Sequence, residues 1–217
     1  MDRSRIALVI PAFNEAGTIA AVVAGSSHYG VPIVVDDASD DDTGGAARLA
    51  GAEVVRHEVN GGYDAALNSG FARAAALGCG YVLTLDADGQ HDPKTLEAFI
   101  HALDTGADVA IGVRDRRQRL GEHLFALVGA LRWGIRDPLC GMKGYRIGVW
   151  AELGHFDSYQ SIGTELALFA AATNKSIAQL PVPTRDRADA PRFGRRMQAN
   201  KRLLRALWLG LTRVRPA

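Results

Sequence analysis

Residues 81–88 read Tyr-Val-Leu-Thr-Leu-Asp-Ala-Asp, an apolar run followed by two carboxylates one position apart. The run has the length and composition of a buried strand. On an extended chain the side chains at positions i and i+2 can face the same way, so Asp86 and Asp88 can share one ligand. Carboxylate oxygens are the ligands of hard divalent cations. We therefore expect a metal site here; the alternative is a turn that caps the next helix, because Asp and Gly also favour turns.

The first half of the chain alternates between strand-like and helix-like segments. Short apolar runs predict strands at Ile6–Ile10, Pro32–Val35, Glu53–His57, Tyr81–Leu85 and Asp108–Val113. Ala-rich segments at helical spacing predict helices at Thr18–Ser26, Thr43–Ala50, Tyr63–Leu77 and Pro93–Leu103. Continuous apolar strands separated by helices favour an α/β fold with a mostly parallel sheet covered on both faces.

The second half has a different pattern. Residues Gly134–Arg146 are rich in loop and turn residues, and Arg185–Arg196 is polar and turn-rich. Helices are expected at Ile162–Thr173 and Met197–Val214, and a strand at Ile177–Val182. No linker divides the chain, so we expect one domain over residues 1–217. Within it, residues 1–115 would form a ligand-binding half, 116–196 a second half and 197–217 a C-terminal amphipathic helix.

Composition places the chain among globular proteins. It has 217 residues, of which 47% are hydrophobic and 23% charged. The cysteines, Cys79 and Cys140, have no paired spacing, which favours free thiols in a reducing cytoplasm over a disulfide or zinc site. No secretory leader and no membrane-spanning segment is expected, because no apolar run is long enough.

The net charge of +1 conceals a basic C-terminal part. Residues 185–217 hold ten Lys or Arg and two Asp or Glu, against fifteen and twenty-two in the preceding residues. Such asymmetry indicates an anionic partner. The segment carries no recognisable nucleic-acid-reading motif, so we expect no nucleic-acid partner.

Polar groups follow three of the predicted strands, where ligands bind in open α/β sheets. These groups are Pro11–Glu15, Asp36–Ser39 and Asp86–Gln90. Asp37 is a candidate contact for a base or ribose, the alternative being a cap for the next helix. Arg114 ends another strand and is a candidate phosphate ligand or a solvated surface residue. Asp137 is a candidate general base or a turn residue.

Together these segments resemble the family 2 glycosyltransferases of the GT-A fold, in particular the branch of dolichyl-phosphate mannose synthases and bacterial polyprenyl-phosphate glycosyltransferases. The resemblance covers most of the chain in the family's order. It rests on Pro11–Glu15, Val35–Thr43, Asn60–Gly62, Asp86–Pro93, Gly112–Arg114, Asp137, Gly141, Arg146, Glu165, Pro181–Pro183 and Arg187.

The resemblance implies Mg²⁺ or Mn²⁺ as cofactor, a UDP- or GDP-linked sugar as donor, and transfer with inversion. It implies donor contacts from Pro11, Phe13, Glu15, Val35, Asp37, Asp86, Ala87, Arg187 and Arg192. The metal ligands would be Asp86, Asp88 and Gln90, and the catalytic residues Asp88, Asp137 and Arg114. The chain departs from the branch in two places: Arg192 stands where a lysine is usual, and Gln179 replaces a common acidic residue.

The acceptor decides whether a general base is needed. A polyprenyl phosphate is already anionic, whereas a saccharide hydroxyl must lose a proton, for which Asp137 is the candidate base. We expect the phosphate acceptor; a hydroxyl acceptor and a non-catalytic nucleotide-binding module are the alternatives. A sugar-phosphate nucleotidyltransferase is disfavoured, since its glycine- and arginine-rich loop is replaced by Pro11–Glu15.

Two amphipathic stretches fit a lipid acceptor. Leu120–Trp133 and the C-terminal helix each combine an apolar face with basic residues, as interfacial helices do. We expect a cytoplasmic enzyme that is peripheral on the inner face of the cell membrane. The alternative is that both stretches pack on the core or in a homodimer.

Overall fold

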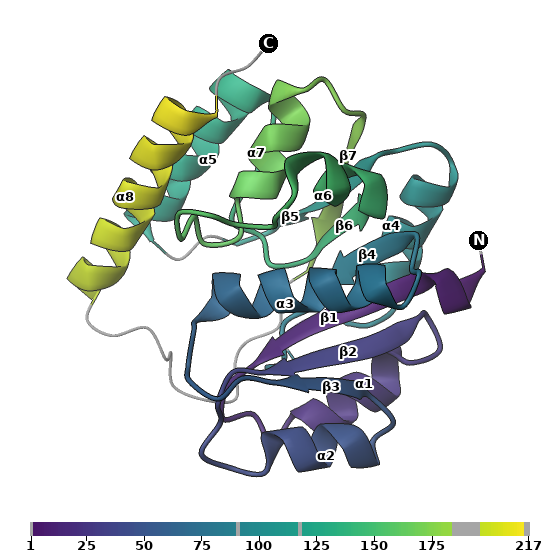
Figure 1. Ribbon diagram of the computed structural model, residues 1–217. Coiled ribbons are helices and arrows are strands. Elements are labelled where there is room, and N and C mark those ends of the chain that lie inside the picture. The colour runs from purple at the N-terminus through teal and green to yellow at the C-terminus, as the bar shows by residue number, and fades with distance from the viewer. Residues whose placement is uncertain (1, 90–91, 117–118, 184–195, 215–217) are drawn as a thin grey trace.

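The computed structural model describes residues 2–89, 92–116, 119–183 and 196–214, with side chains from residue 200 onward in the last range. Its centre is a seven-stranded sheet in the order β3-β2-β1-β4-β6-β5-β7 (Figure 1). The strands are β1 (Ile6–Ala12), β2 (Val31–Asp36), β3 (Glu53–Arg56), β4 (Tyr81–Thr84), β5 (Val109–Arg114), β6 (Lys143–Arg146) and β7 (Ile177–Val182). The pairs that include β6 are antiparallel and the others are parallel. The expected mostly parallel sheet is confirmed.

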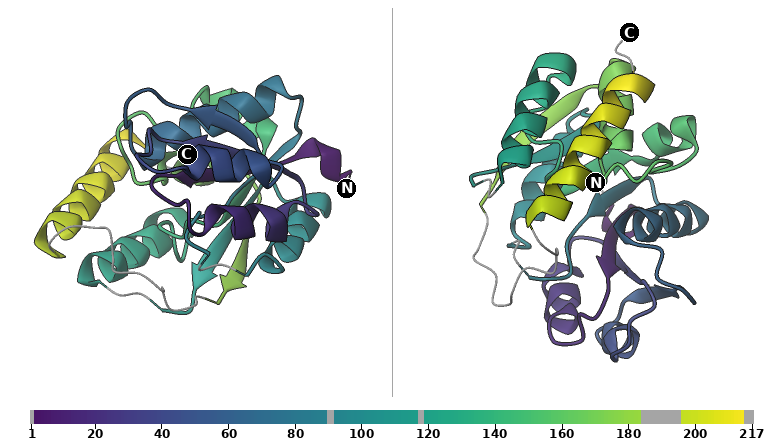
Figure 2. Two further views of the ribbon diagram at one scale, coloured as in Figure 1. Left: turned by 90° about the horizontal axis from the view of Figure 1, so that it is seen from below. Right: turned by 90° about the vertical axis from the view of Figure 1, so that its left-hand side faces the viewer.

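Helices connect the strands and cover the sheet. They are α1 (Ile19–Ser26), α2 (Thr43–Leu49), α3 (Tyr63–Ala76), α4 (Thr95–Asp104), α5 (Leu120–Trp133), α6 (Ile147–Leu153), α7 (Glu165–Ala172) and α8 (Arg196–Arg213). A short 3-10 turn at Arg3–Arg5 precedes β1. In Figure 2, α5 and α8 lie side by side along one flank of the molecule.

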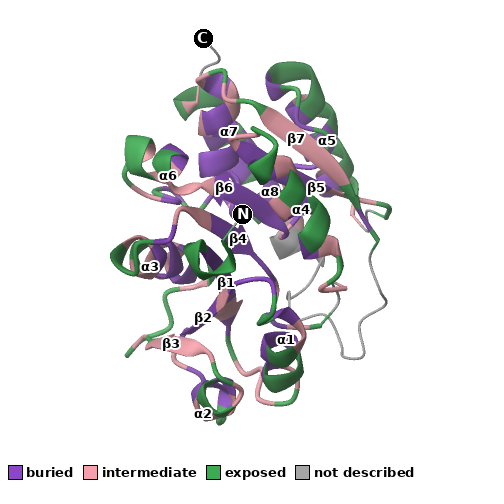
Figure 3. Cartoon of the chain, turned by 90° about the vertical axis from the view of Figure 1, so that its right-hand side faces the viewer, coloured by how far each residue is buried: buried purple, intermediate pink, exposed green. Residues whose placement is uncertain are grey.

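The core has two layers because strand side chains alternate between the faces of the sheet. Ala7 and Val9 of β1 join one apolar cluster, which includes residues of α3, α5, α6, α7 and α8. Ile6, Leu8 and Ile10 join a second cluster, with residues of α1, α2 and α4. Figure 3 shows the central strands buried between these layers, while the edge strands β3 and β7 are partly exposed. Both faces of the sheet are therefore covered, as the apolar strands predict.

Gly70 sets how closely α3 packs on the sheet. A Cβ at this position would overlap Cγ1 of Val9 and stand 3.2 Å from its Cγ2. Because Val9 is fully buried and stiff at χ1, neither partner can move aside easily. The glycine thus permits the close approach of α3 to β1.

Two elements depart from the sequence prediction. Lys143–Arg146 was expected to be loop but forms β6, and α6 was not predicted. The strand Lys-Gly-Tyr-Arg has little apolar pattern of its own; it is held between β4 and β5, where Gly144 packs near Leu83 and Ala110. Helix α7 begins at Glu165, later than the expected Ile162, because Ile162 and Gly163 have positive φ angles of 59° and 69°.

The described residues contain no helix that is both long enough and apolar enough to cross a bilayer.

Candidate functional site

The candidate site lies at one edge of the sheet. The register pairs Val9 with Thr84 and Pro11 with Val35, so the segments that follow β1, β2 and β4 emerge together. Since β6 runs the opposite way, its first residue, Lys143, pairs with Thr84 and lies at this edge too. The expected convergence of polar strand ends is confirmed, and Arg114 at the end of β5 belongs to the same edge.

The loops after β1 and β2 are tied together. Asn14, with a positive φ of 55°, donates its backbone N–H to Ser39 Oγ at 3.0 Å and accepts from the N–H of Asp40 at 2.8 Å. Glu15 donates its N–H to Thr43 Oγ1 at 2.8 Å. These bonds fix the backbone that follows Phe13, a residue that stays 39% exposed. An exposed aromatic ring at the ligand edge of a sheet is available for stacking.

The acidic pair at the end of β2, Asp36 and Asp37, is buried, and both carboxylates bond to neighbouring groups of the fold. Asp36 accepts from the Ser39 N–H at 3.0 Å and forms an ion pair with Arg56. Asp37 accepts from the N–H groups of Gly61 and Gly62 at 2.8 and 2.7 Å. Neither carboxylate caps α2, so the helix-cap alternative is wrong. The Asp37 carboxylate instead holds the glycine-rich loop that precedes α3.

His57 is a member of this site that sequence reasoning missed. Its Nδ1 lies 2.6 Å from Asp37 Oδ1, and its Nε2 lies 2.8 Å from Ser69 Oγ on α3. The ring therefore joins the end of β2 to α3. The only sequence signal is its position as the last residue of a predicted strand, which many histidines share.

Asp86 and Asp88 emerge together at the end of β4. Leu85 and Ala87 are buried while Asp86 and Asp88 are partly exposed, so both acidic residues reach the surface at this edge of the sheet. The Asp86 carboxylate lies directly against Gly141: a Cβ there would stand 2.8 Å from Asp86 Oδ1 and closer still to Oδ2. Two partly exposed carboxylates have the oxygen chemistry that Mg²⁺ and Mn²⁺ prefer.

No third acidic, histidine or cysteine side chain completes a metal cluster within the described part of the chain. The expected ligand Gln90 and the expected diphosphate contacts Arg187 and Arg192 lie outside the described residues.

Arg114 and Asp137 form a bidentate ion pair. The guanidinium Nε and Nη2 of Arg114 donate to the two Asp137 oxygens at 2.8 and 2.9 Å, and the Arg114 backbone N–H donates at 3.1 Å. Glu122 of α5 lies 3.9 Å from Arg114 Nη1 and 3.6 Å from Arg119 Nη1. Burial alone would lower the pKa of Arg114, but the bonds to Asp137 outweigh it and raise the pKa. Arg114 is therefore a fixed cation.

Lys143 is a second cation that sequence reasoning missed. Its side chain is buried, and its Nζ donates to the backbone oxygens of Cys140 and Gly163 at 2.6 and 3.0 Å. Burial lowers its pKa, against the opposing charges of Cys140, Asp137 and Asp86. Its signal in the sequence is hidden, because the segment was read as a loop in which a lysine would be exposed.

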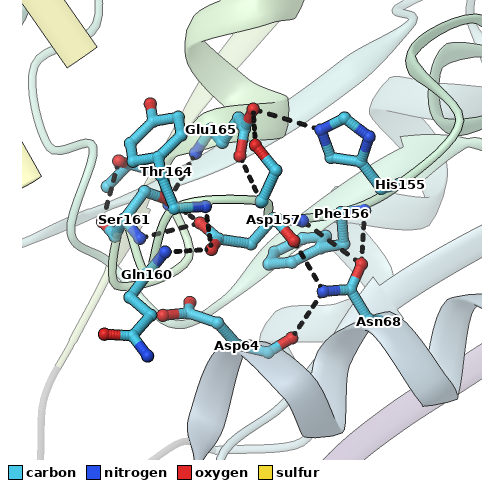
Figure 4. A network of polar contacts seen from close by, with 11 residues as sticks. Asp64, Asn68, His155, Phe156, Asp157, Gln160, Ser161, Thr164 and Glu165 are labelled. Carbon is cyan, nitrogen blue, oxygen red and sulfur yellow. Dashed lines mark hydrogen bonds and ion pairs between the residues drawn. The ribbon is translucent and has the colours of Figure 1, made fainter. Parts of the chain in front are cut away.

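An acidic network lies beside this edge, between α3 and α7 (Figure 4). Asp157 accepts from the N–H groups of Gln160 and Ser161 at 2.6 and 2.8 Å. Glu165 accepts from Ser158 Oγ at 2.9 Å and lies 3.1 Å from His155 Nε2. These bonds shape the segment that leads into α7.

Asp64, in the first turn of α3, closes the network. It accepts from the N–H groups of Gly163 and Ile162 at 2.6 and 3.2 Å. Burial and the nearby charge of Asp157 raise the pKa of Asp64 to about 6. The acid thus connects α3, which follows the glycine-rich loop, to the loop that contacts Lys143.

Comparison with known proteins identifies the family. The model of glycosyl transferase family 2 matches residues 7–124, which carry β1 to β5 and the acidic strand ends. The chain belongs to glycosyl transferase family 2. The resemblance read from the motifs is therefore confirmed.

Several relatives have named activities, of which two serve as examples. The chain is 37% identical to polyprenol monophosphomannose synthase of Mycolicibacterium smegmatis over 120 residues, 51% of this chain and 45% of that protein. It is 29% identical to dolichyl-phosphate hexose transferase of Haloferax volcanii over 84% of each chain. The match thus spans less than half of the mycobacterial synthase, and 61% of an uncharacterized protein of Methanocaldococcus jannaschii.

The GT-A fold is seen in a solved structure. Glucosyl-3-phosphoglycerate synthase from Mycobacterium tuberculosis, crystallised with Mn²⁺ and UDP-glucose, superposes with a TM-score of 0.74 at 26% identity. The superposition covers 94% of this chain and 77% of the synthase.

Proposed function

We propose that this family 2 chain is a metal-dependent, inverting glycosyltransferase that moves a sugar from a nucleotide-diphosphate sugar to a polyprenyl phosphate. The observation that carries the proposal is the meeting of Asp86, Asp88 and Arg114 at one sheet edge. Acids suit a cation and arginine suits phosphate oxygens, so this edge has the chemistry to bind a diphosphate. The named relatives, both of which act on lipid phosphates by their names, support the acceptor.

Asp86 and Asp88 would hold the Mg²⁺ or Mn²⁺, with Gln90 assisting. The cation, when bound, neutralises charge on the leaving diphosphate. The partial exposure of both acids supports this assignment, and the synthase crystallised with Mn²⁺ and UDP-glucose provides a parallel in the same fold. Arg187 and Arg192 would contact the donor diphosphate.

The nucleoside would lie over the loops that follow β1 and β2. Phe13 offers an exposed ring to the base, and the partly exposed Pro11 and Glu15 would line the same position, whereas the expected contacts Val35 and Ala87 are buried. Asp37 would act indirectly, by fixing the glycine-rich loop, because its own side chain is nearly inaccessible. A UDP- or GDP-linked donor is consistent with these groups.

The engagement of the nearby acids favours a phosphate acceptor. A hydroxyl acceptor needs a carboxylate able to take its proton. Asp137 is held by two bonds from the Arg114 guanidinium, and Glu165 is held by Ser158 and His155. A polyprenyl phosphate needs no base, since its oxygen is already anionic. The phosphate oxygen would attack the anomeric carbon opposite the diphosphate, whose bond to that carbon breaks, and the configuration inverts.

Donor binding provides the first test. Thermal unfolding of the wild type should shift upward with UDP or GDP only when Mg²⁺ or Mn²⁺ is present, because a ligand that binds the native state stabilises it. Gly141→Ala should weaken this cation-dependent affinity by about tenfold or more, equivalent to ~1.4 kcal/mol, since its Cβ displaces Asp86.

Gly148→Ala is the matched control, because Gly148 lies on α6 with open space around it. It should bind nucleotide as the wild type does. A wild type that shows no cation-dependent shift with any nucleotide or nucleotide sugar would remove the catalytic proposal.

Asp137→Asn separates the two acceptor classes. With a phosphate acceptor the variant should keep partial turnover, since the carboxylate only orients Arg114. With a saccharide hydroxyl acceptor, loss of the base should abolish turnover while donor affinity persists. Release of nucleoside diphosphate, measured with each acceptor, distinguishes these outcomes. A chain that binds donor but transfers nothing would be a binding module.

The flank formed by α5 and α8 would dock on the membrane that carries the acceptor. Exposed apolar side chains there are Leu120, Leu124, Leu127 and Leu131 on α5, and Leu204, Trp208 and Leu211 on α8. The exposed cations Arg132, Lys201, Arg202 and Arg205 are interspersed with them. Apolar groups with basic residues suit an anionic membrane surface. The site would then face the inner leaflet from the cytoplasm.

Vesicle sedimentation tests whether the flank of α5 and α8 docks on a membrane. The double variant Leu127→Glu with Trp208→Glu should bind phosphatidylglycerol vesicles far more weakly than the wild type at low salt. Leu49→Glu is the control, because Leu49 is exposed on α2, away from this flank. Absence of wild-type binding would exclude docking of this flank on the membrane. A concentration-dependent dimer that the double variant disrupts would instead assign the flank to self-association.

A further inference from the structure

Lys143 is a buried cation to which the proposed reaction gives no role. Only 3% of the residue is exposed, and its Nζ donates to the oxygens of Cys140 and Gly163. Two backbone carbonyls do not compensate for removing an ammonium group from water. The remaining compensation comes from negative charge, because Asp86 and Asp137 both act on this lysine. The groups that this ammonium holds in place therefore indicate its role.

The first group that Lys143 holds is the backbone against Asp86. Lys143 bonds the Cys140 oxygen at 2.6 Å, while Thr84 Oγ1 donates to the Gly141 oxygen at 2.6 Å and accepts from the Lys143 N–H at 3.0 Å. The Cys140–Gly141 backbone is thereby fixed from both β4 and β6. Since Gly141 lies directly against the Asp86 carboxylate, this backbone limits where that carboxylate can stand.

The second group is the loop before α7. Asp64 takes the N–H groups of Ile162 and Gly163, and Lys143 donates to the Gly163 oxygen at 3.0 Å. The Asp64 carboxylate and the Lys143 ammonium group thus both bond the backbone of the same left-handed turn. Asp64 directly follows the glycine-rich loop that Asp37 holds. Through the Gly163 turn and Asp64, Lys143 therefore connects the backbone beside Asp86 to the loop beside the nucleoside position.

We propose that Lys143 is a positioning residue of the donor site. Its ammonium group holds the Cys140 and Gly163 carbonyls so that Asp86 is aligned for the cation and the diphosphate. Its charge also offsets those of Asp86 and Asp137 before these ligands arrive. The inference rests on the proposed function, because the alignment matters only if Asp86 serves a donor.

Three variants test the inference. Lys143→Met removes the charge and both hydrogen bonds, and Lys143→Arg keeps the charge with a different donor geometry. Lys175→Met is the matched control, since Lys175 pairs with Glu152 beside the amino end of β7, at the opposite edge of the sheet. Circular dichroism first establishes that each variant is folded.

The first readout is hydrogen exchange of the ligand-free protein. Lys143→Met should accelerate exchange in residues 137–143 and in residues 160–165 together, and Lys175→Met in neither. The second readout is calorimetric affinity for UDP or GDP with Mn²⁺. Lys143→Met should lose about tenfold or more, a change of ~1.4 kcal/mol, with Lys143→Arg in between.

Wild-type exchange in both segments, or wild-type nucleotide affinity, in a folded Lys143→Met would overturn the inference. If Lys143→Met does not fold, Lys143→Arg supplies both readouts, and wild-type values in it have the same meaning. If the wild type itself binds no nucleoside diphosphate with any cation, the proposed function fails. Hydrogen exchange still decides, in that case, whether Lys143 holds the two loops.

Discussion

The carboxyl group of Asp64 illustrates the conflict between local structure and charge at the residue scale. It accepts two backbone N–H groups and lies near Lys143, and both effects favour the ionised form. Burial and the charge of Asp157 oppose ionisation more strongly, so the pKa is raised to about 6. The acid that shapes the loop before α7 is therefore under electrostatic strain at neutral pH.

This strain predicts a pH dependence of stability. Because the folded-state pKa lies above the unfolded value, the folded state binds more protons between pH ~4 and ~6. The free energy of unfolding should fall as pH rises through this window, by up to ~1.4 kcal/mol per pH unit from this group. Asp64→Asn should reduce the loss of Tm between pH 4.5 and 6.5.

Asp40→Asn serves as the control for that titration, because its side chain is exposed. The two variants should differ in the pH dependence of Tm. Equal pH dependence in Asp64→Asn and the wild type would contradict the assigned role of Asp64.

At the scale of elements, the packing of α3 on β1 determines the position of the glycine-rich loop. The helix begins directly after Gly62 and approaches β1 most closely at Gly70. A shift of α3 would therefore move both Asp64 and the loop that Asp37 holds. The tight contact between Gly70 and Val9 therefore fixes the position of the glycine-rich loop.

Gly70→Ala should destabilise the protein by about 1–3 kcal/mol, the usual result of overpacking a core. Gly148→Ala, in the exposed part of α6, should instead be neutral or stabilise by up to ~1 kcal/mol, as alanine does at an exposed helical position. Urea unfolding of both variants measures the difference. Similar stabilities would show that α3 can move away from Val9 at little cost.

At the scale of the whole molecule, the two thiols report on how the structure opens. Cys79 and Cys140 are both buried free thiols. Burial, with the charge of Asp137, raises the pKa of Cys140 to about 11, and burial raises that of Cys79. A thiol needs both exposure and ionisation to react, so neither should react in the folded state.

We expect a disulfide reagent at pH 8 to label both cysteines slowly and at similar rates, set by unfolding of the domain. In denaturant both should react at once. Rapid labelling of Cys140 alone would show that the loop beside Asp86 opens locally, which would contradict a backbone fixed by Thr84 and Lys143.

The sequence predicted the elements whose own residues show a clear apolar pattern. The β-branched runs of β1, β2 and β5 and the alanine-rich α3 follow local pattern, and strand ends in a parallel sheet must meet. Strand β6 could not be found in this way, because its buried lysine and glycine are stabilised by distant partners. Likewise, the pairing of Asp137 with Arg114 depends on contacts across 23 positions, which spacing alone does not reveal.

The reversed direction of β6 has a consequence for how this protein could diversify. The excursion of chain from Arg114 to Lys143 leaves the sheet and returns to it at the same edge. Residues can therefore be added to or removed from this excursion without altering the register of any strand. Selection for new acceptors can act on the exposed positions between Arg114 and Asp137, while Asp137, Gly141 and the donor-handling framework of β1, β2 and β4 stay constant.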